Sequence, residues 1–247
     1  VEFVRQVNLG EAAALSGKAL VIGGGNVAID VARSAARVGA QSTALFCLES
    51  RKQMPALEEE IAEAEEEGIE INNGWGPARI LTRDGRVCGV EFKKCLSVFD
   101  ADGRFHPTYD EGETIQVEAD QVLVAIGQAI TWGGLLEGSA ARLNPNQTIQ
   151  ADPLTYQTAQ ADVFAGGDAL TGPRFAIDAI AAGKQAAISI HRFVHPGQSL
   201  TIGRSRREYT SLDKSDLDLE SYDRMPRQQA GHGRADNTFR DPCQTLN

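Results

Sequence analysis

The sequence predicts an α/β fold in which an antiparallel meander interrupts a parallel sheet. Three observations support this prediction. Apolar runs with the length of buried strands alternate with helical patterns over residues 18–72. The hydrophobic period then changes to two between residues 78 and 117. An apolar run at 121–128 restores the first pattern, and another at 162–168 leads into a long helical pattern.

The first expected unit is a strand, a glycine turn and a helix. Residues 19–22 are Ala-Leu-Val-Ile, and an amphipathic helix follows the glycines. Gly23 allows a tight turn, Gly25 lets a pyrophosphate approach the backbone, and the small Ala28 lets the helix pack on the strand. This context predicts a Rossmann-like NAD(P)-binding domain, with a tight turn that binds no ligand as the alternative. The predicted phosphate contacts are backbone groups of the turn and of the first helical turn: Gly23, Gly24, Gly25, Asn26 and Val27.

The end of the second strand, expected over 41–48, bears on the choice of nucleotide. Glu49 lies about 24 residues after the last glycine, close to the position where an acidic residue binds the adenosine ribose. A carboxylate there accepts hydrogen bonds from the ribose and repels a 2′-phosphate, which favours NAD(H) over NADP(H). Ser50 follows as a further predicted contact. Arg51 and Lys52 would favour NADP(H) instead, because either could pair with a 2′-phosphate. The alternative for both residues is a solvated helix start.

A helix is expected over 56–67, with its glutamates on a solvated face and a buried stripe of Leu57, Ile61 and Ala64. A third strand follows at 69–72. Antiparallel strands are then expected over 78–81, 87–98 and 114–117, with turns at 83–85 and 100–103. Residues 121–128 read as a buried strand that returns to the first sheet.

A second candidate site follows a short apolar strand at 162–168, which ends in Gly167 and Asp168. The helix after it, about 175–194, has its apolar positions at Ile177, Ile180, Ala181, Ala187, Ile188 and Ile190. A carboxylate beside a helix N-terminus can bind a polyol hydroxyl. A helix cap or turn residue is the alternative for Asp168.

Composition narrows the partners. The net charge of −10 argues against nucleic acid or an anionic membrane as a main partner. No apolar run approaches the roughly 18 residues that cross a bilayer. The cysteines Cys47, Cys88, Cys95 and Cys243 have no metal or disulfide spacing, so we expect a reducing cytoplasm, core roles for Cys47 and Cys88, and no metal site.

The motifs at residues 21–28, 124–128 and 162–168 together resemble the two-dinucleotide-binding-domain flavoproteins, and most of all the glutamate synthase small (β) subunit and its relatives. The resemblance implies that the first glycine cluster binds NAD(P)H and that the Gly-Asp segment binds FAD. It adds two groups of expected cofactor contacts. Beside the nicotinamide dinucleotide these are Ala125, Ile126 and Gly127, and beside the flavin they are Gly167, Asp168, Phe175 and Ala176.

The resemblance also implies a domain division: a connector at 1–15, the NAD(P)-binding domain at 16–128, the C-terminal half of an FAD-binding domain at 129–195, and a polar, partly disordered tail at 196–247. The family's iron–sulfur region and the first half of its FAD domain would precede Val1. The glutamate synthase branch usually carries an Arg pair after its second strand, which suits NADPH. This chain has Leu48-Glu49 at that place, which agrees with a preference for NAD(H).

The implied activity is hydride transfer from NAD(P)H to FAD, with electrons passing on to an iron–sulfur domain or an electron-acceptor subunit. No acid–base side chain is needed for that step, so no catalytic residue is predicted, and the chain by itself is expected to lack turnover. The alternatives are a nucleotide-binding or docking module without turnover and, less favoured, a class I methyltransferase. A methyltransferase would not explain the Gly-Asp segment.

Overall fold

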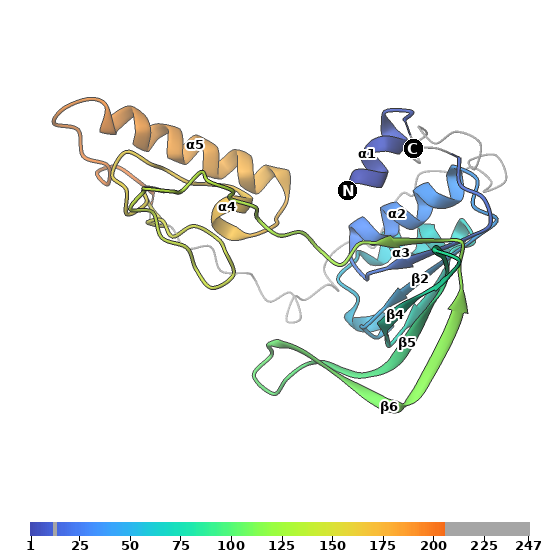
Figure 1. Cartoon of the computed structure of the whole chain (residues 1–247). Helices are drawn as coiled ribbons and strands as arrows, with labels where there is room; N and C mark the ends of the chain where they lie inside the picture. The colour runs from blue at the N-terminus through green and yellow to red at the C-terminus, as the bar shows by residue number, and fades with distance from the viewer. Residues whose placement is uncertain (12–13, 206–247) are drawn as a thin grey trace, which may run out of the picture. The chain divides into compact units, whose positions relative to one another are not determined.

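The computed structural model describes residues 1–11 and 14–205 of the chain. They form two compact units, Val1–Gly127 and a second unit that begins at Gln128 (Figure 1). The expected tail at 196–247 falls mostly on residues 206–247, which lie outside the described residues together with Cys243.

The first unit contains a four-stranded parallel sheet in the order β3-β2-β1-β7. In register, Ile22 of β1 lies between Phe46 of β2 and Val124 of β7. The carboxyl ends of these three strands therefore meet at one edge of the sheet. The strands that the sequence predicts here are confirmed, and their bounds are β1 Lys18–Ile22, β2 Ser42–Cys47, β3 Glu70–Asn73 and β7 Gln121–Val124.

Helices cover one face of this sheet (Figure 1). The helical elements of the unit are α1 Glu2–Asn8, α2 Asn26–Arg37, the 3₁₀ turn η1 Arg51–Gln53 and α3 Glu58–Glu66. Val21 of β1, Ile29 of α2 and Ile61 of α3 are fully buried in the shared core, and Phe3 of α1 packs at its margin.

An antiparallel meander covers the other face. Its strands are β4 Trp75–Arg83, β5 Arg86–Phe99 and β6 Phe105–Glu118, in the order β4-β5-β6. Leu20, Ile22 and Phe46 turn away from the helices and form a second core with Val90 and Phe92. The rings of Phe46 and Phe92 stack with centroids 4.3 Å apart. The inserted meander therefore completes the burial of the parallel sheet.

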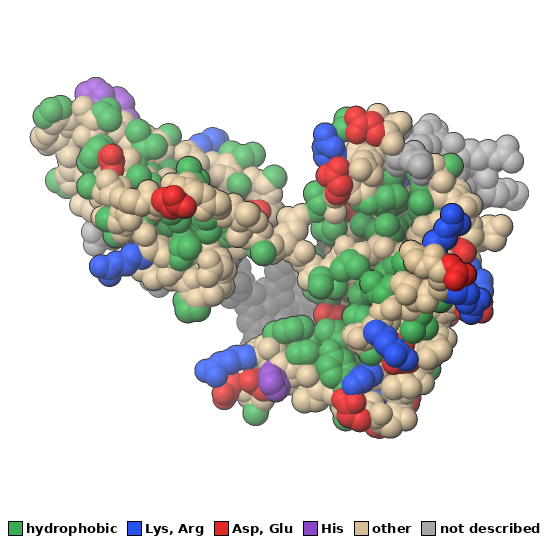
Figure 2. Space-filling view, viewed as in Figure 1, with side chains coloured by type: hydrophobic (Ala, Val, Ile, Leu, Met, Phe, Trp, Pro, Cys, Tyr) green, Lys and Arg blue, Asp and Glu red, His purple; other side chains and the backbone are tan. Residues whose placement is uncertain are grey.

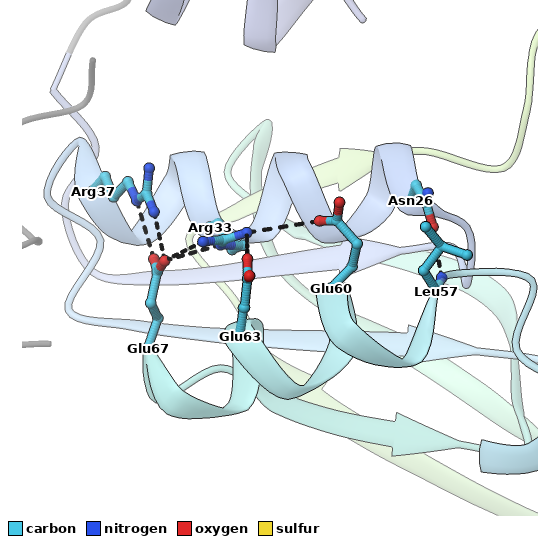
Figure 3. A network of polar contacts seen from close by, with 7 residues as sticks. All are labelled: Asn26, Arg33, Arg37, Leu57, Glu60, Glu63 and Glu67. Carbon is cyan, nitrogen blue, oxygen red and sulfur yellow. Dashed lines mark hydrogen bonds and ion pairs between the residues drawn. The ribbon is translucent and has the colours of Figure 1, made fainter. Parts of the chain in front are cut away.

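Polar contacts join α2 to α3 (Figure 3). The Arg33 guanidinium lies 2.8 Å from a Glu67 carboxylate oxygen, 2.7 Å from Glu63 and 3.7 Å from Glu60. Arg37 approaches Glu67 to 2.5 Å. Burial alone would lower the pKa of Arg33, but its hydrogen bonds and ion pairs with Glu67 and Glu63 outweigh burial and raise it.

Four sequence predictions for this unit are wrong. Cys88, expected in the core, is only half-buried, because it lies close to the turn at 84–85 that joins β4 to β5. Glu67 is buried rather than solvated, because two arginines of α2 reach its carboxylate. Leu57 is exposed, because the helix begins one residue later and Leu57 becomes its N-cap. β7 is half-buried rather than buried, because it forms an edge of the sheet.

The part of the second unit that the structure describes, residues 128–205, contains two helices, α4 Asp168–Thr171 and α5 Ala176–Phe193. The strand predicted over 162–168 is wrong. Residues 161–162 form a turn, in which the Val163 amide donates to the Gln160 carbonyl at 3.0 Å, and Phe164 makes an isolated bridge with Gln157. The α5 helix buries a narrow stripe of Ala182, Ala186 and Ser189. Hydrophobic side chains lie on the surface of this unit (Figure 2). The apolar positions predicted for the helix are exposed at Ile177, Ile180, Ala181, Ala187, Ile188 and Ile190.

Glu67→Ala should lower the free energy of unfolding of the first unit by about 2 kcal/mol, because a nearly buried Arg33 loses its most buried carboxylate partner. Urea unfolding followed by Trp75 fluorescence, in a Trp132→Phe background, measures this unit alone. The matched control, Glu70→Ala on the exposed side of β3, should change the free energy by less than about 0.5 kcal/mol. Equal effects of the two changes would contradict the prediction.

Candidate functional site

The glycine turn joins the end of β1 to the start of α2. Gly23 has a φ of 144°, and its amide donates to the Phe46 carbonyl at 2.9 Å. A Cβ added at Gly23 would lie 2.3 Å from the Ala125 carbonyl oxygen and 3.2 Å from the Ala28 Cβ. Only glycine fits between these neighbours. This confirms the tight turn and the close approach of helix and strand that the sequence predicts.

Gly25 is the N-cap of α2 and differs from Gly23. It has an ordinary φ of −92°, and a Cβ added there would meet nothing within 4 Å. The first amides of a helix have no intrahelical acceptor, so those of Asn26 and Val27 point out of the N-terminus. The turn thus presents an open surface of backbone donors, which is the arrangement that binds a pyrophosphate.

Glu49 faces this turn from the end of β2. A Cβ added at Gly24 would lie 2.7 Å from a Glu49 carboxylate oxygen and 3.1 Å from the Cys47 Cβ. The half-buried Glu49 side chain therefore lies directly beside the glycine turn, where an acidic residue can accept bonds from a ribose.

Hydrogen bonds tie the loop after β2 to the turn. The Ala56 amide donates to the Gly24 carbonyl at 3.2 Å, and the Leu57 amide donates to the Asn26 side-chain oxygen at 2.8 Å (Figure 3). Asn26 thereby serves as an acceptor for the N-cap of α3, a role that the sequence did not suggest. These two hydrogen bonds join the loop that follows Glu49 to the glycine turn and to the start of α2.

Ser50 and Arg51 bond to neighbours within this loop and its helix. The Ser50 hydroxyl donates to Gln53 at 2.7 Å. The Arg51 guanidinium makes two hydrogen bonds to the Glu58 carboxylate, at 2.9 and 3.2 Å, and one to Glu65 at 3.4 Å. Arg51 is therefore engaged by α3 rather than extended into solvent.

Two residues that the sequence analysis missed hold Glu49 in place. The Asn73 side-chain amide donates to the Glu49 carbonyl at 3.1 Å and to the Cys47 sulfur at 3.2 Å, and the Gly74 amide donates to the same carbonyl at 3.1 Å. Asn73 could have been found from the sequence, because a polar residue that ends β3 lies beside the end of β2 in a parallel sheet.

Burial, with a smaller effect of the nearby Glu49 charge, raises the pKa of Cys47 to about 12.

Residues 125–127 continue from the end of β7 at the same edge of the sheet. The Ala125 amide donates to the Ile22 carbonyl at 2.8 Å. Ile126 is 74 % exposed, and Gly127 has a φ of 116°. The structure thus brings one group of predicted residues together at the strand ends: Gly23–Val27, Glu49–Arg51 and Ala125–Gly127.

The remaining predicted residues belong to the second unit. Gly167, with a φ of 62°, is the N-cap of α4, and Asp168 is the first residue of that helix. An Asp168 carboxylate oxygen accepts a bond of 3.3 Å from the Arg174 amide, next to Phe175 at the start of α5. Asp168, Phe175 and Ala176 are exposed. A carboxylate and an uncapped helix N-terminus therefore lie side by side.

Among residues 1–11 and 14–205, no group of three His, Cys, Asp or Glu side chains has the arrangement of a metal site. None of the helices in that part of the chain combines the length and the hydropathy needed to cross a bilayer.

The geometry of the first unit is that of a dinucleotide-binding turn, and a family comparison agrees with it. The family model described as pyridine nucleotide-disulphide oxidoreductase matches residues 1–183. The chain belongs to this family. Family membership supports the binding of FAD and of a nicotinamide dinucleotide, and it confirms the resemblance and fold class that the sequence motifs predict.

Curated relatives within this family cover most of the chain. One is 37% identical over 80% of the chain: the "NADP(+)-dependent formate dehydrogenase subunit beta" of Moorella thermoacetica, of which 28% is covered. The "NADPH-Fe(3+) oxidoreductase subunit beta" of Geobacter sulfurreducens is 32% identical over 81% of the chain and 33% of its own length. The "Glutamate synthase [NADPH] small chain" of Azospirillum brasilense is 35% identical over 70% of the chain and 36% of its length. The chain thus spans about a third of these proteins.

Solved structures share the fold. Lactococcus lactis thioredoxin reductase superposes with a TM-score of 0.61 and 22% identity, over 77% of this chain and 56% of that one. The FprA protein of Mycobacterium tuberculosis superposes with a TM-score of 0.57 and 14% identity, over 72% and 53%.

Cys47 should make folding sensitive to alkaline pH. Because the pKa of the folded thiol is raised to about 12, its stabilising contribution is complete below the unfolded pKa near 9 and is lost as the pH rises towards 12. Between about pH 8 and about pH 10, the wild-type free energy of unfolding should fall by about 1.5 kcal/mol more than that of Cys47→Ala. Urea unfolding at both pH values measures this difference, and parallel losses in the two proteins would contradict the raised pKa.

Proposed function

We propose that this chain binds NAD(H) in its first unit and part of an FAD in its second, as an electron-transfer module of a longer oxidoreductase. We assign residues 16–128 to the dinucleotide-binding domain and 129–195 to the second half of an FAD-binding domain. The observation that carries the proposal is the open backbone surface at Gly25, with the Glu49 carboxylate beside Gly24.

The residues of the glycine turn fit a dinucleotide. The pyrophosphate would lie against Gly25 and the amides of Asn26 and Val27, where the positive end of the α2 dipole also favours an anion. The adenosine ribose would lie against Glu49, which follows the neighbouring strand. The Ala125–Gly127 segment, in which Ile126 and Gly127 are exposed, would line the site from the other side of β1, since β7 pairs with β1 there.

We propose NAD(H) rather than NADP(H) because of the charges around the ribose position. Glu49 would accept bonds from the free ribose hydroxyls and would repel a 2′-phosphate. Arg51, one of the two basic residues that could pair with that phosphate, is paired with two glutamates. The names of three relatives contain NADP(+) or NADPH, so a preference for NADH would distinguish this chain from those proteins.

In the second unit, Gly167, Asp168 and the N-terminus of α5 at Phe175 and Ala176 are the proposed FAD contacts. Asp168 would accept a hydrogen bond from a ribityl hydroxyl, and the α5 amides would face an electron-rich edge of the flavin. When bound, the two cofactors supply hydride and single-electron chemistry, while this chain holds and orients them. We therefore propose no catalytic side chain.

The proposed electron acceptor is an iron–sulfur domain or a partner subunit, since the relatives named above are subunits. We propose a cytoplasmic location on the basis of cysteine usage alone.

One experiment separates the two candidate functions. If the protein with FAD bound is yellow and NADH bleaches it, the proposed oxidoreductase activity is supported. A colourless protein that binds NADH would instead support a nucleotide-binding module without turnover.

Gly25→Ala should weaken NADH binding at least about tenfold and leave stability nearly unchanged, because the new methyl group occupies the space of the pyrophosphate without touching the protein. Calorimetric titration and thermal unfolding measure the two effects. Gly23→Ala is the comparison: it should destabilise the fold, since its methyl group meets the Ala125 carbonyl. Unchanged NADH affinity in Gly25→Ala would count against the proposed pyrophosphate site.

Glu49→Gln should weaken NADH binding about tenfold, because a charged acceptor for two ribose hydroxyls is lost. NADPH binding should change little or improve. Parallel titrations of the two nucleotides measure this split, with Glu70→Gln as a control that removes a charge from the neighbouring strand β3. Tighter binding of NADPH than of NADH by the wild-type chain would overturn the proposed preference.

A further inference from the structure

We propose that Glu58 and Glu65 of α3 disfavour a 2′-phosphorylated nucleotide by holding Arg51 in ion pairs. The two carboxylates would then be specificity-determining residues that act through Arg51 without touching the nucleotide. This inference rests on the proposed dinucleotide site and deepens it.

The contacts of Arg51 use the atoms that a phosphate would need. Glu58 binds both terminal nitrogens of the guanidinium, at 2.9 and 3.2 Å, and Glu65 binds one of them at 3.4 Å. Arginine recognises phosphate through the same planar pair of N–H donors. A 2′-phosphate and the carboxylates of α3 would therefore compete for one set of donors.

The spacing on α3 makes this arrangement persistent. Glu58 and Glu65 lie seven residues apart, which is about two helical turns, so both side chains lie on one face of the helix. Single exposed ion pairs contribute little, but here two carboxylates on one rigid element share a guanidinium. The Arg51 side chain is only 34 % exposed, compared with 76 % for Glu58, so the arginine rests against the protein.

Other contacts fix α3 itself. Its C-terminal half is joined to α2 through Arg33 and Glu63, and its N-cap Leu57 is bonded to Asn26 (Figure 3). Because Asn26 is the first residue of α2, directly after the glycine turn, the carboxylates that hold Arg51 are set at a constant position relative to the proposed phosphate site.

The test is a double variant, Glu58→Gln with Glu65→Gln, in the 247-residue chain. Calorimetric titration should show NADPH binding about five- to tenfold tighter than in the wild type, with NADH affinity within about twofold. A second probe pair, 2′,5′-ADP and 5′-AMP, differs only in the 2′-phosphate. The gain should appear for 2′,5′-ADP and be absent for 5′-AMP. Thermal unfolding checks that each variant retains the wild-type fold.

Two controls separate restraint of Arg51 from simple charge repulsion. Adding Arg51→Gln to the double variant should cancel the gain, because the phosphate then has no released partner. A charge-matched control, Glu70→Gln with Glu113→Gln, changes two exposed glutamates of the first unit that have no bond to Arg51 in the described part of the chain. It should give no gain.

Each outcome decides the inference. A gain that survives Arg51→Gln, or that the charge-matched control reproduces, would overturn it. NADH binding by the wild type without any gain in the double variant would overturn it alone. A wild-type chain that binds neither dinucleotide would overturn the proposed function and this inference together. A wild-type chain that prefers NADPH would also overturn the inference, because the ion pairs of Arg51 would then not disfavour the 2′-phosphate.

Discussion

The first unit depends on the burial of β1 on both faces. Val21 packs against the helices, whereas Leu20 and Ile22 pack against the antiparallel meander. A parallel strand covered on both sides needs apolar residues at every position, which is what residues 19–22 provide. Because β2 and β7 run parallel to this strand on either side, the segments that follow the three strands all begin at the same edge of the sheet. The candidate site forms at that edge.

Close packing at that edge explains the division of roles among the glycines. Gly23 is required by its neighbours, since the backbone of Ala125 and the side chain of Ala28 leave no space for a Cβ. Among the residues that the structure describes, Gly25 has no such neighbour, so packing within residues 1–11 and 14–205 does not require a glycine there. A position that is free of protein contacts at a helix N-terminus is suited to a ligand, which connects the packing of the fold to the proposed binding of a dinucleotide.

The acidic helix α3 shows how one run of like charges can serve different physical purposes. Glu67 is buried and satisfied by two arginines of α2, so it fixes the helix to the fold. Glu58 and Glu65 lie on the side of Arg51 and form ion pairs with its guanidinium. Burial and geometry, rather than composition, decide which glutamate has which role.

The sequence by itself determined the order of strands and helices in the first unit, the glycine turn and the position of Glu49 near it. These features depend on local hydrophobic period and on the backbone freedom of glycine, which neighbouring residues along the chain reveal. It also predicted the family through three short motifs.

Other features depended on the tertiary structure. The strand predicted over 162–168 is absent, because a strand needs a partner that the local pattern does not specify. Tertiary structure alone decided that Glu67 is buried, that Asn26 bonds to Leu57, that Asn73 holds Glu49 and that Arg51 is paired with α3. Each of these contacts depends on how separate elements pack together, which the local pattern of residues along the chain does not specify.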